Sequence, residues 1–354
     1  MKKMIFTGGG SGGHVIPAKT IITEILQKKT DVEILYVGGK KSIERKIIEE
    51  MNIKYFPIST GKLRRYFSIE NATDFFRFIF GIIQSVFILA RFRKNSLVFS
   101  TGGFVALPVV IASKLLGIKS IIHEQTAVAG LANKISSKFC DQVLISFEKS
   151  KENFPSEKTT LTGYPVSKKC FDEPSFPIEI KKGASLAGKG EKRILLITGG
   201  GNGSKLINDV TKEILGELKS RYKVFHQVGS HYETEFSKLE DENYIPFGFT
   251  NSLVDLIKIS DVVVSRAGAG TVMELISMGK KSIFVPLKIA QKNEQFHNAV
   301  EAKDVLGSEI ILEDNFNAQS LLSSVNCFDS SPKEKIDNKA SDKIIEIIFN
   351  EVKA

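Results

Sequence analysis

Two stretches of the sequence decide the fold: MIFTGGGSGGH at residues 4–14 and ITGGGNGS at residues 197–204. In each, a short apolar run leads directly into a cluster of glycines, and a segment with helical spacing follows. Glycines allow a sharp turn between a strand and a helix, and the unpaired N–H groups at the start of that helix suit an anionic group. The repeat therefore predicts two similar nucleotide-binding halves.

Further apolar runs alternate with helical patterns along the whole chain. We predict strands at residues 4–6, 34–37, 97–99, 120–122, 143–145, 194–197, 224–226, 262–264, 283–285 and 310–312. Strands that alternate with helices form parallel sheets covered on both faces. The sequence thus predicts an α/β fold of two Rossmann-like domains, whose parallel sheets face a central cleft.

A polar segment at residues 168–192 separates the two halves and contains two prolines. Its composition is typical of a linker, and 354 residues exceed what one hydrophobic core usually supports. We predict an N-terminal domain at residues 1–163 and a second domain at residues 164–335. Residues 336–354 are expected to form an amphipathic helix, with the N-terminal domain as a suggested packing surface.

Composition and charge limit the partners and the compartment. The chain carries 49 Lys and Arg against 40 Asp and Glu, and residues 1–150 hold 22 of these basic and 11 of these acidic side chains. The local excess predicts an anionic partner, and the lack of a nucleic-acid-binding motif argues against DNA or RNA. Widely spaced cysteines, histidines outside metal-ligand spacing and a short apolar N-terminus favour a reducing, cytosolic compartment without a metal.

The basic excess is greatest around residues 75–92, a phenylalanine-rich and nearly apolar segment. We expect this segment to be too short and too interrupted to cross a bilayer. One interpretation is adsorption to an anionic membrane, at about 1 kcal/mol for each well-placed Lys or Arg. The other is a core helix with solvated ends. The candidate membrane-contacting residues are Lys62, Arg64, Arg65, Phe75, Phe76, Phe80, Phe87, Arg91 and Arg93.

The first glycine loop fits the pattern GxGxxG at Gly8, Gly10 and Gly13. A dinucleotide site of this type also needs an acidic residue at the end of the second strand, and residues 34–40 end without one. This disfavours NAD. A tight turn that binds no ligand is the alternative.

Two histidines follow predicted strands, where the loops of an α/β protein line its binding crevice. His14 closes the first glycine loop, and His123 is followed by Glu124. A histidine suits general-base chemistry near neutral pH. A hydrogen-bonded structural role is the alternative.

A third strand, loop and helix unit is predicted at residues 261–275, where SRAGAGTVMEL leads into a helix that we expect to begin at Thr271. Thr271 and Glu274 fit a capping box, in which their side chains satisfy the N–H groups of their own helix. Alternatively, the helix N-terminus holds the diphosphate of a sugar nucleotide, and Glu274 accepts hydrogen bonds from ribose hydroxyls. Spacing alone leaves both interpretations open.

Seven motifs occur in an order that resembles glycosyltransferase family 28. They are FTGGGSGGHVIPA at residues 6–18, STGGFVALPVVIA at 100–112, HEQTAVAGLANK at 123–134, LTGYPV at 161–166, ITGGGNGSKLIN at 197–208, SRAGAGTVMEL at 265–275 and QFHNA at 295–299. Within the family, the resemblance is to the enzymes that move N-acetylglucosamine (GlcNAc) from UDP-GlcNAc to lipid I, which gives lipid II in peptidoglycan synthesis.

The resemblance implies a GT-B fold and an inverting, metal-independent hexosyl transfer to the C4 hydroxyl of N-acetylmuramic acid (MurNAc). UDP-GlcNAc would be a substrate, and no cofactor is implied. The resemblance also implies a peripheral protein on the cytoplasmic face of the bacterial cell membrane. Its partners would be lipid I and an anionic membrane surface, and it would serve cell wall formation, cell shape and cell division.

Site residues follow from the resemblance position by position. It implies that His14 is a base or an acceptor contact, with Glu124 as a weaker catalytic candidate. It implies a backbone contact of Thr250 to uracil, contacts of residues 269–274 to diphosphate and ribose, and contacts of Gln295 to the sugar. The donor-site set is Ser11, Gly12, Gly13, Thr126, Ser167, Gly201, Thr250, Arg266, Ala269, Gly270, Thr271, Val272, Met273, Glu274, Gln295 and Asn298.

Three positions depart from the family pattern. Thr126 stands where the family has Asn, Ser167 where it has Arg, and Gly201 where it has Ser. Each change shortens or removes a polar side chain whose hydrogen bond is worth about 1 kcal/mol, and more where a charge is lost. Two alternatives therefore stay open: a related transferase that uses another lipid acceptor, and a non-catalytic, sugar-nucleotide-binding membrane scaffold.

Overall fold

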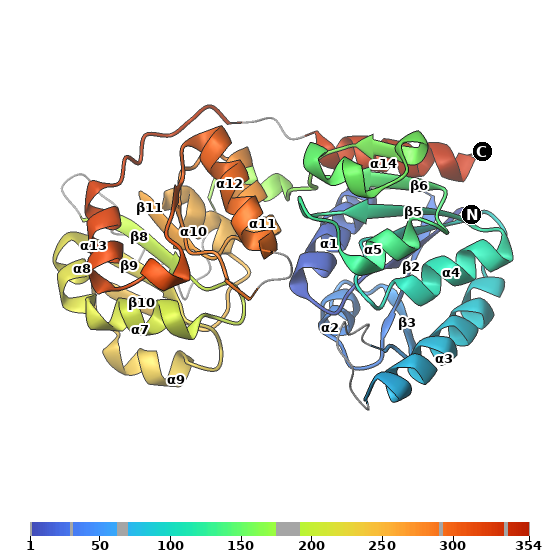
Figure 1. The fold of residues 1–354 in the computed structure, drawn as a ribbon, viewed down its shortest axis with the longest axis horizontal. Coiled ribbons are helices and arrows are strands. Elements are labelled where there is room, and N and C mark those ends of the chain that lie inside the picture. The colour runs from blue at the N-terminus through green and yellow to red at the C-terminus, as the bar shows by residue number, and fades with distance from the viewer. Residues whose placement is uncertain are drawn as a thin grey trace. The chain divides into compact units, whose positions relative to one another are not determined.

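A computed structural model describes residues 2–28, 31–61, 70–174, 192–289, 293–335 and 339–353. The chain forms two compact units: unit 1 consists of Met1–Val166 and Asn338–Ala354, and unit 2 of Ser167–Asp337. Each unit contains one parallel β-sheet with helices packed against it (Figure 1). The predicted α/β architecture, with a parallel sheet in each half, is confirmed.

Unit 1 contains seven strands among its described residues, in the order β3-β2-β1-β4-β5-β6-β7. They are β1 (Lys2–Thr7), β2 (Val32–Gly39), β3 (Lys54–Ile58), β4 (Ser96–Ser100), β5 (Lys119–Glu124), β6 (Gln142–Ile145) and β7 (Thr159–Leu161). The helices are α1 (Gly12–Gln27), α2 (Ile43–Glu49), α3 (Glu70–Ala90), α4 (Leu107–Leu116), α5 (Leu131–Ser136) and α14 (Ala340–Lys353), with short 3-10 turns η1 (Glu148–Asn153) and η2 (Ser156–Lys158). The order changes direction between β1 and β4, so the loops after these strands flank a switch point where ligands commonly bind.

Alternating side chains of β1 explain why helices cover both faces of this sheet. Phe6 packs with α1 and α14 on one face, and Ile5 packs with α3 and α4 on the other. The C-terminal helix α14 belongs to this unit (Figure 1), because Ile344 and Ile348 are fully buried in the first of these cores. Two surface ion pairs, Lys28 with Asp342 and Lys119 with Glu351, add to its attachment.

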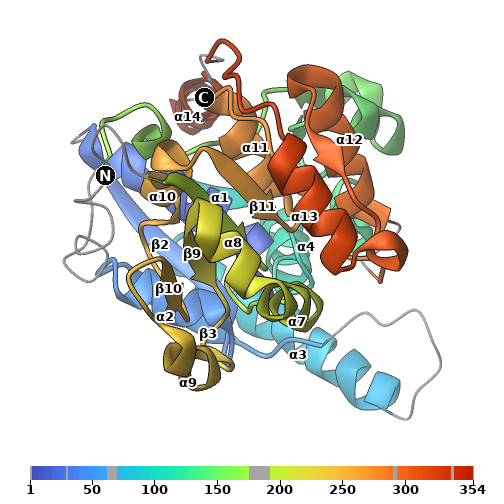
Figure 2. The same cartoon turned by 90° about the vertical axis from the view of Figure 1, so that its left-hand side faces the viewer.

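Unit 2 contains six strands among its described residues, in the order β10-β9-β8-β11-β12-β13. They are β8 (Arg193–Thr198), β9 (Tyr222–Gln227), β10 (Tyr244–Phe247), β11 (Val262–Ser265), β12 (Ile283–Phe284) and β13 (Glu309–Ile310). The helices are α7 (Lys205–Glu213), α8 (Leu215–Arg221), α9 (Glu233–Phe236), α10 (Leu253–Ile259), α11 (Ala269–Ser277), α12 (Glu294–Leu306) and α13 (Ala318–Cys327), with 3-10 turns η3 (Lys168–Cys170), η4 (Ser237–Leu239) and η6 (Glu313–Asn315). Helices α7, α8 and α13 form a core with β8 and β9 (Figure 2).

All ten predicted strands occur, and three further strands were missed. The missed strands β3, β7 and β10 all lie at the edges of their sheets. Pro57 in β3 and Pro246 in β10 lack the N–H group that a central strand would need, so the sequence did not resemble a strand there. The last predicted strand, at residues 310–312, is shorter and earlier in the structure, at Glu309–Ile310.

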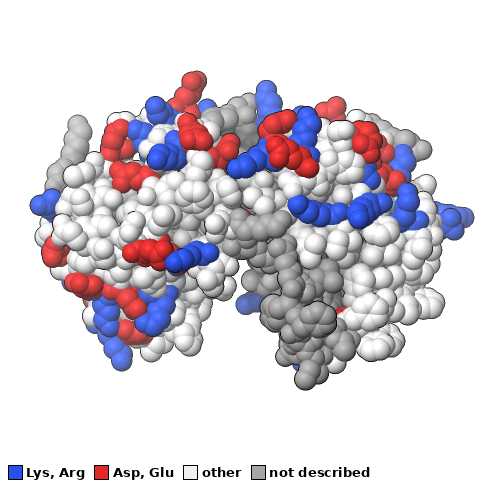
Figure 3. Space-filling view, viewed as in Figure 1, with Lys and Arg blue, Asp and Glu red and all other residues white. Residues whose placement is uncertain are grey.

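Helix α3 has an apolar face that the rest of unit 1 leaves exposed. Phe75, Phe76, Phe80 and Phe87 are between 58% and 67% exposed. Figure 3 shows few charged side chains over this part of unit 1 and a row of Lys and Arg beside it. Arg91 and Arg93 are exposed after the helix, whereas Lys62, Arg64 and Arg65 lie outside the described residues.

The opposite face of α3 packs against unit 1. Gly81, Ser85 and Leu89 are buried, and a Cβ on Gly81 would overlap the carbonyl oxygen of Ser59. The expectation that the segment is too short to span a bilayer was wrong, because residues Thr73–Ala90 meet the length and composition of a span. In the structure this helix instead divides into a packed face and an exposed apolar face.

Candidate functional site

The glycine loop after β11 leads into α11 of unit 2. The helix begins at Ala269, two residues before the predicted start at Thr271. Gly268 is its N-cap residue and no side chain caps it, so the capping-box interpretation of Thr271 and Glu274 is wrong. The first N–H groups of α11 thus find no capping side chain within the described residues, which suits an anionic group.

Glu274 lies one turn along α11 and keeps part of its surface exposed. Its surroundings are poor in water, and this burial raises the pKa of Glu274 to about 7. A carboxyl group in such a place favours its neutral form until hydrogen-bond donors reach it. Ribose hydroxyls would be suitable donors, and this role stays a prediction.

The other predicted residues of α11 differ in exposure. Ala269, Gly270, Thr271 and Met273 are partly exposed. Val272 is fully buried in unit 2, so it can reach a ligand only through its backbone.

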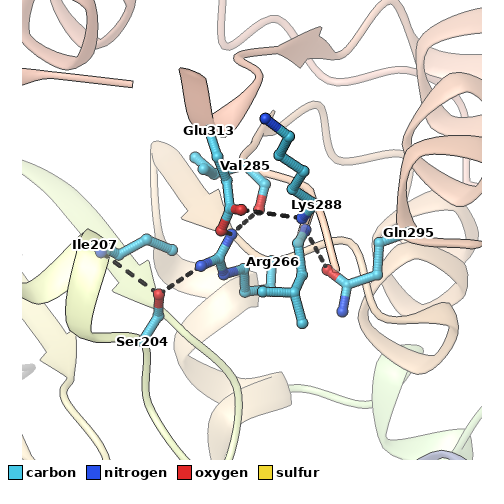
Figure 4. Close-up of polar contacts among 8 residues, drawn as sticks. Ser204, Ile207, Arg266, Val285, Lys288, Gln295 and Glu313 are labelled. Atoms are coloured by element: carbon cyan, nitrogen blue, oxygen red, sulfur yellow. Dashed lines mark hydrogen bonds and ion pairs between the residues drawn. The ribbon is translucent and has the colours of Figure 1, made fainter. Parts of the chain in front are cut away.

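Arg266, at the end of β11, is held by neighbours from three other loops (Figure 4). Its guanidinium pairs with Glu313 at 2.6 Å, and it donates to the Val285 carbonyl at 3.0 Å and to the Ser204 hydroxyl at 2.8 Å. The second oxygen of Glu313 accepts from the backbone N–H of Lys288 at 3.0 Å. Arg266 therefore ties these loops together, and its action on a diphosphate stays a prediction.

Two residues of α12 make hydrogen bonds to the loops that follow β11 and β12. Oε1 of Gln295 accepts from the N–H of Leu287 at 3.0 Å, which orients the amide (Figure 4). Asn298 is buried, and its Nδ2 donates to the carbonyl of Ala267 at 3.1 Å. We assign Asn298 to positioning the loop before α11, rather than to direct contact with a donor.

An aromatic side chain beside the second glycine loop was missed by the sequence analysis. Phe249 is 61% exposed, and a Cβ on Gly201 would lie 3.8 Å from its ring. The next residue, Thr250, accepts a hydrogen bond at Oγ1 from the N–H of Ser252 at 3.0 Å. A flat, exposed ring at the end of β10 suits a nucleotide base. Because β10 was not predicted, no signal in the sequence indicated that this ring follows a strand.

The first glycine loop, in unit 1, is braced by an acidic side chain. Glu44 of α2 is buried and accepts from the N–H groups of Gly39 at 3.0 Å and Gly10 at 3.2 Å. The hydroxyl of Tyr36 donates to the carbonyl of Gly8 at 2.6 Å. Residues 34–40 contain no acid, as the sequence shows, and the carboxyl near the end of this strand comes from Glu44 in α2. Both oxygens of Glu44 are engaged by the backbone, so this carboxyl shapes the loop and is not presented to a ribose.

The start of α1 follows this loop. Its N-cap residue Ser11 is exposed and makes no capping hydrogen bond with its side chain. Gly13 is exposed and Gly12 is partly exposed. Their predicted contacts with phosphates stay predictions.

His14 lies in the first turn of α1 and is partly exposed. Its Nδ1 is 2.9 Å from the carbonyl oxygen of Thr101 and 3.3 Å from Oε1 of Gln125. A carbonyl oxygen only accepts, so Nδ1 carries the proton and Nε2 keeps a lone pair. This arrangement is compatible with the predicted role of His14 as a base.

The neighbouring His123 and Glu124 have structural roles. Burial lowers the pKa of His123 to about 4, which keeps it neutral. Glu124 is buried and accepts from Thr126 at 2.7 Å and 3.0 Å and from Gly130 and Asn133 at 3.0 Å. With both oxygens engaged, Glu124 organises the loop after β5, and this structural role argues against the catalytic role predicted for it.

The polar side chains of two departing positions have local partners. The hydroxyl oxygen of Thr126 lies 2.7 Å from Oε1 of Glu124 and 2.9 Å from the carbonyl oxygen of Val128, both within unit 1, and its one proton can be donated to either. Ser167 of unit 2 accepts from the N–H of Lys169 at 3.3 Å and caps η3. Within the described residues, no group of three or more His, Cys, Asp or Glu side chains is arranged to hold a metal ion.

Two family models match the chain. The model of the glycosyltransferase family 28 N-terminal domain matches residues 4–145, and that of the family's C-terminal domain matches residues 194–348. Among curated proteins, the chain is 38% identical over 348 residues to a protein of Clostridium botulinum, covering 97% of this chain and 96% of that protein. A Borrelia turicatae protein is 36% identical over 347 residues, covering 97% and 91%. Both are named UDP-N-acetylglucosamine–N-acetylmuramyl-(pentapeptide) pyrophosphoryl-undecaprenol N-acetylglucosamine transferase.

Solved structures show the same fold. The crystal structure of Acinetobacter baumannii MurG matches 99% of this chain and all of its own, with a TM-score of 0.71 and 22% identity. UDP-GlcNAc 2-epimerase from Neisseria meningitidis, bound to UDP-GlcNAc, matches 99% of this chain and all of its own, with a TM-score of 0.68 and 15% identity.

Proposed function

The chain belongs to glycosyltransferase family 28 and has its GT-B fold, and from this we infer that it transfers GlcNAc from UDP-GlcNAc to the MurNAc sugar of a pyrophosphoryl-undecaprenol lipid. The C4 hydroxyl of MurNAc attacks the anomeric carbon, and UDP leaves from the opposite side with inversion. No metal takes part. The product would be lipid II, for peptidoglycan synthesis.

The observation that carries this proposal is the uncapped start of α11. A helix N-terminus of this kind attracts a diphosphate, and stabilising the departing diphosphate is the main electrostatic task of the reaction. Glu274 lies one turn further along the same helix, where its carboxyl suits the ribose hydroxyls. Gln295 presents an oriented amide from α12 for the sugar hydroxyls.

The loops after β8 and β10 complete the donor site in unit 2. Gly201 and the exposed ring of Phe249 lie side by side, and the backbone of Thr250 follows. A uracil that packs on Phe249 would find peptide N–H and C=O groups at its edge. This assigns the base to the loops after β8 and β10, and the ribose and diphosphate to α11, whose preceding strand β11 pairs with β8.

The general base that accepts the hydroxyl proton is a residue of unit 1, His14. Nε2 of His14 keeps a lone pair because Nδ1 faces the Thr101 carbonyl at 2.9 Å. As the new bond forms, the proton of the C4 hydroxyl passes to Nε2. A histidine that keeps a free lone pair is suited to accept this proton near neutral pH.

The exposed phenylalanines of α3 support a peripheral position on the cytoplasmic face of an anionic membrane. An apolar face bordered by Arg91 and Arg93 fits a surface that carries the lipid acceptor. The packed face of the same helix, with Ser85 and Leu89, holds it to unit 1.

The test incubates the purified protein with UDP-GlcNAc and a lipid I analogue in EDTA. We expect release of UDP and formation of a β-linked disaccharide lipid. Glu274→Gln should weaken UDP-GlcNAc binding by about tenfold, which is one lost hydrogen bond. His14→Ala should lower kcat and leave donor binding unchanged.

Two outcomes would contradict the proposal and favour its alternatives. A folded protein that binds UDP-GlcNAc but releases no UDP with any lipid acceptor would be a scaffold. Turnover confined to a different lipid would indicate a related transferase with another acceptor.

A further inference from the structure

Gln125 of the loop after β5 connects two histidines of unit 1. Its Oε1 lies 3.3 Å from Nδ1 of His14. Its Nε2 lies 3.0 Å from the carbonyl oxygen of His123 and 3.3 Å from Nδ1 of His123. The side chain is buried, so both ends of the amide depend on these partners.

The hydrogen-bond partners of Gln125 determine which end of its amide is the oxygen and which is the NH₂ group. The carbonyl oxygen of His123 only accepts, so the amide NH₂ faces it and Oε1 faces His14. Nε2 of His123 lies 3.1 Å from the carbonyl oxygen of Gly163 and therefore carries the proton. Nδ1 of His123 is then an acceptor for the NH₂ group, which agrees with the orientation reached from the carbonyl.

The protonation of His123 is constant over the working pH range. Its side chain is fully buried, and burial lowers its pKa to about 4. A neutral His123 with its proton on Nε2 presents the same acceptor to Gln125 at all neutral pH values. The chain of donors and acceptors therefore has one direction: His14 donates to Gln125, Gln125 to His123, and His123 to Gly163.

The backbone around His14 also restricts the orientation of its imidazole ring. The loop after β4 places Gly103 at a positive φ of 83°, and a Cβ there would lie 3.1 Å from Cδ2 of His14. The ring thus packs directly on this glycine. The hydroxyl of Thr101 also donates to the carbonyl of His14 at 2.6 Å, which fixes the backbone from which the ring projects.

We propose that Gln125, itself oriented by His123, is a positioning residue that acts together with the Thr101 carbonyl to hold His14 in the tautomer protonated at Nδ1, so that Nε2 faces the acceptor hydroxyl with a lone pair. This rests on the proposed function. In the transfer, the bond from the C4 oxygen to the anomeric carbon forms and the bond from that carbon to the phosphate oxygen breaks. UDP leaves with the electron pair, and the hydroxyl proton moves to Nε2. Thr101 and Gln125 then hold the Nδ1 proton of the resulting imidazolium.

The test is ¹⁵N NMR of histidine-labelled protein above pH 8, with His14 assigned by its loss in His14→Ala. The wild type should show a protonated Nδ1 and an unprotonated Nε2 for His14. Gln125→Met keeps the length of the side chain and removes both polar ends. Thr101 then remains as the one acceptor at Nδ1, so the two signals should shift part of the way towards those of a mixture of tautomers. Gln125→Glu keeps an acceptor towards His14 and should retain the wild-type pattern.

A matched control and a kinetic measurement separate positioning from folding. Ser146 lies 3.4 Å from Nε2 of His123, on the side away from Gln125, so Ser146→Ala should leave the His14 signals unchanged. Gln125→Met should lower kcat by about tenfold with both KM values within about twofold, since it disturbs only proton transfer.

Three results would overturn the inference. They are a wild-type His14 protonated at Nε2, a Gln125→Met variant with unchanged His14 signals, or a Ser146→Ala variant that shifts them equally. A wild type with the expected tautomer but without transferase activity would refute the proposed function and leave the positioning role standing.

Discussion

The glycine loops after β1 and β8 have nearly the same sequence but opposite charges behind them. In unit 1 the acidic Glu44 accepts from Gly10 and Gly39. In unit 2 the cationic Arg266 donates to Ser204, which ends the loop and caps α7. The comparison teaches that a glycine motif sets the turn, whereas the side chains beneath it decide which charge a ligand meets.

The two loops differ in the same way at the helix that follows. Ser204 accepts from the N–H of Ile207 at 3.4 Å, so its side chain already caps α7, whereas Ser11 leaves the start of α1 without a side-chain cap. In unit 2 the helix after β11, α11, is one that starts without a side-chain cap. Of the two glycine loops of unit 2 that lead into a helix, the loop before α11 is therefore the better candidate for the predicted anion site.

The largest loss of stability is expected from removing the guanidinium of Arg266 in unit 2. Arg266→Ala leaves Glu313 with only one backbone donor and removes the hydrogen bonds to Ser204 and Val285. It should lower the free energy of unfolding by about 3 kcal/mol. Unfolding of a two-domain protein is rarely two-state. The loss of stability should therefore be located by hydrogen exchange measured on individual peptides of the protein. Amides of residues 199–204 and 285–289 should lose protection, while residues 8–13 of unit 1 should not.

A double variant measures how much of this effect is the ion pair. Arg266→Ala combined with Glu313→Ala should cost less than the two single changes together, by about 1 to 3 kcal/mol. Strict additivity would mean that Arg266 acts through its two neutral contacts alone, and the charge contrast between the loops would lose its basis.

The second effect tests the acidic brace of unit 1. Glu44→Gln keeps one acceptor and turns the other towards a backbone N–H as a donor, so it should destabilise unit 1 by about 1 to 2 kcal/mol. Thermal unfolding and exchange at residues 8–13 would report it. Glu49→Gln, on the same helix, breaks only an exposed pair with Arg45 and should change stability by less than about 0.5 kcal/mol. Equal effects of the two changes would contradict the brace.

These residues also show how far the sequence could predict the molecule. Ten runs of β-branched and apolar residues were found, nine of them central strands, because buried parallel strands are continuous apolar segments. The sequence did not reveal the hydrogen-bond partners of Glu44, Gln125 and Glu313. Each of these side chains joins loops separated by tens of residues or reaches back into a turn. Periodicity reports which side of an element is buried, and it carries no information on which carboxyl meets which N–H.

The third prediction concerns pH. Burial raises the pKa of Glu274 from about 4.5 to about 7, so folding should become less favourable as pH rises through this interval and stay so above it. Glu274→Gln should therefore stabilise the unliganded protein at pH 8 by about 1 to 2 kcal/mol, less than the full shift because the carboxyl is partly exposed. Below pH 4 the two proteins should agree. Melting curves across pH, with the exposed Glu240→Gln as control, would measure it, and a constant difference at all pH values would contradict it.

The smallest effect lies in the second glycine loop itself. Gly201 is exposed, its φ is not in the left-handed region, and a Cβ would meet only the ring of Phe249 at 3.8 Å. Gly201→Ser should leave thermal stability within about 0.5 kcal/mol and strengthen UDP-GlcNAc binding by up to about threefold, by restoring the hydroxyl of the family pattern. Gly203→Ser is the matched control. At Gly203 φ is 74° and a Cβ would overlap the carbonyl oxygen of Val228, so that change should destabilise unit 2 instead. Weaker donor binding by Gly201→Ser would mean that this loop closes on its ligand through the bare backbone, as the glycine itself allows.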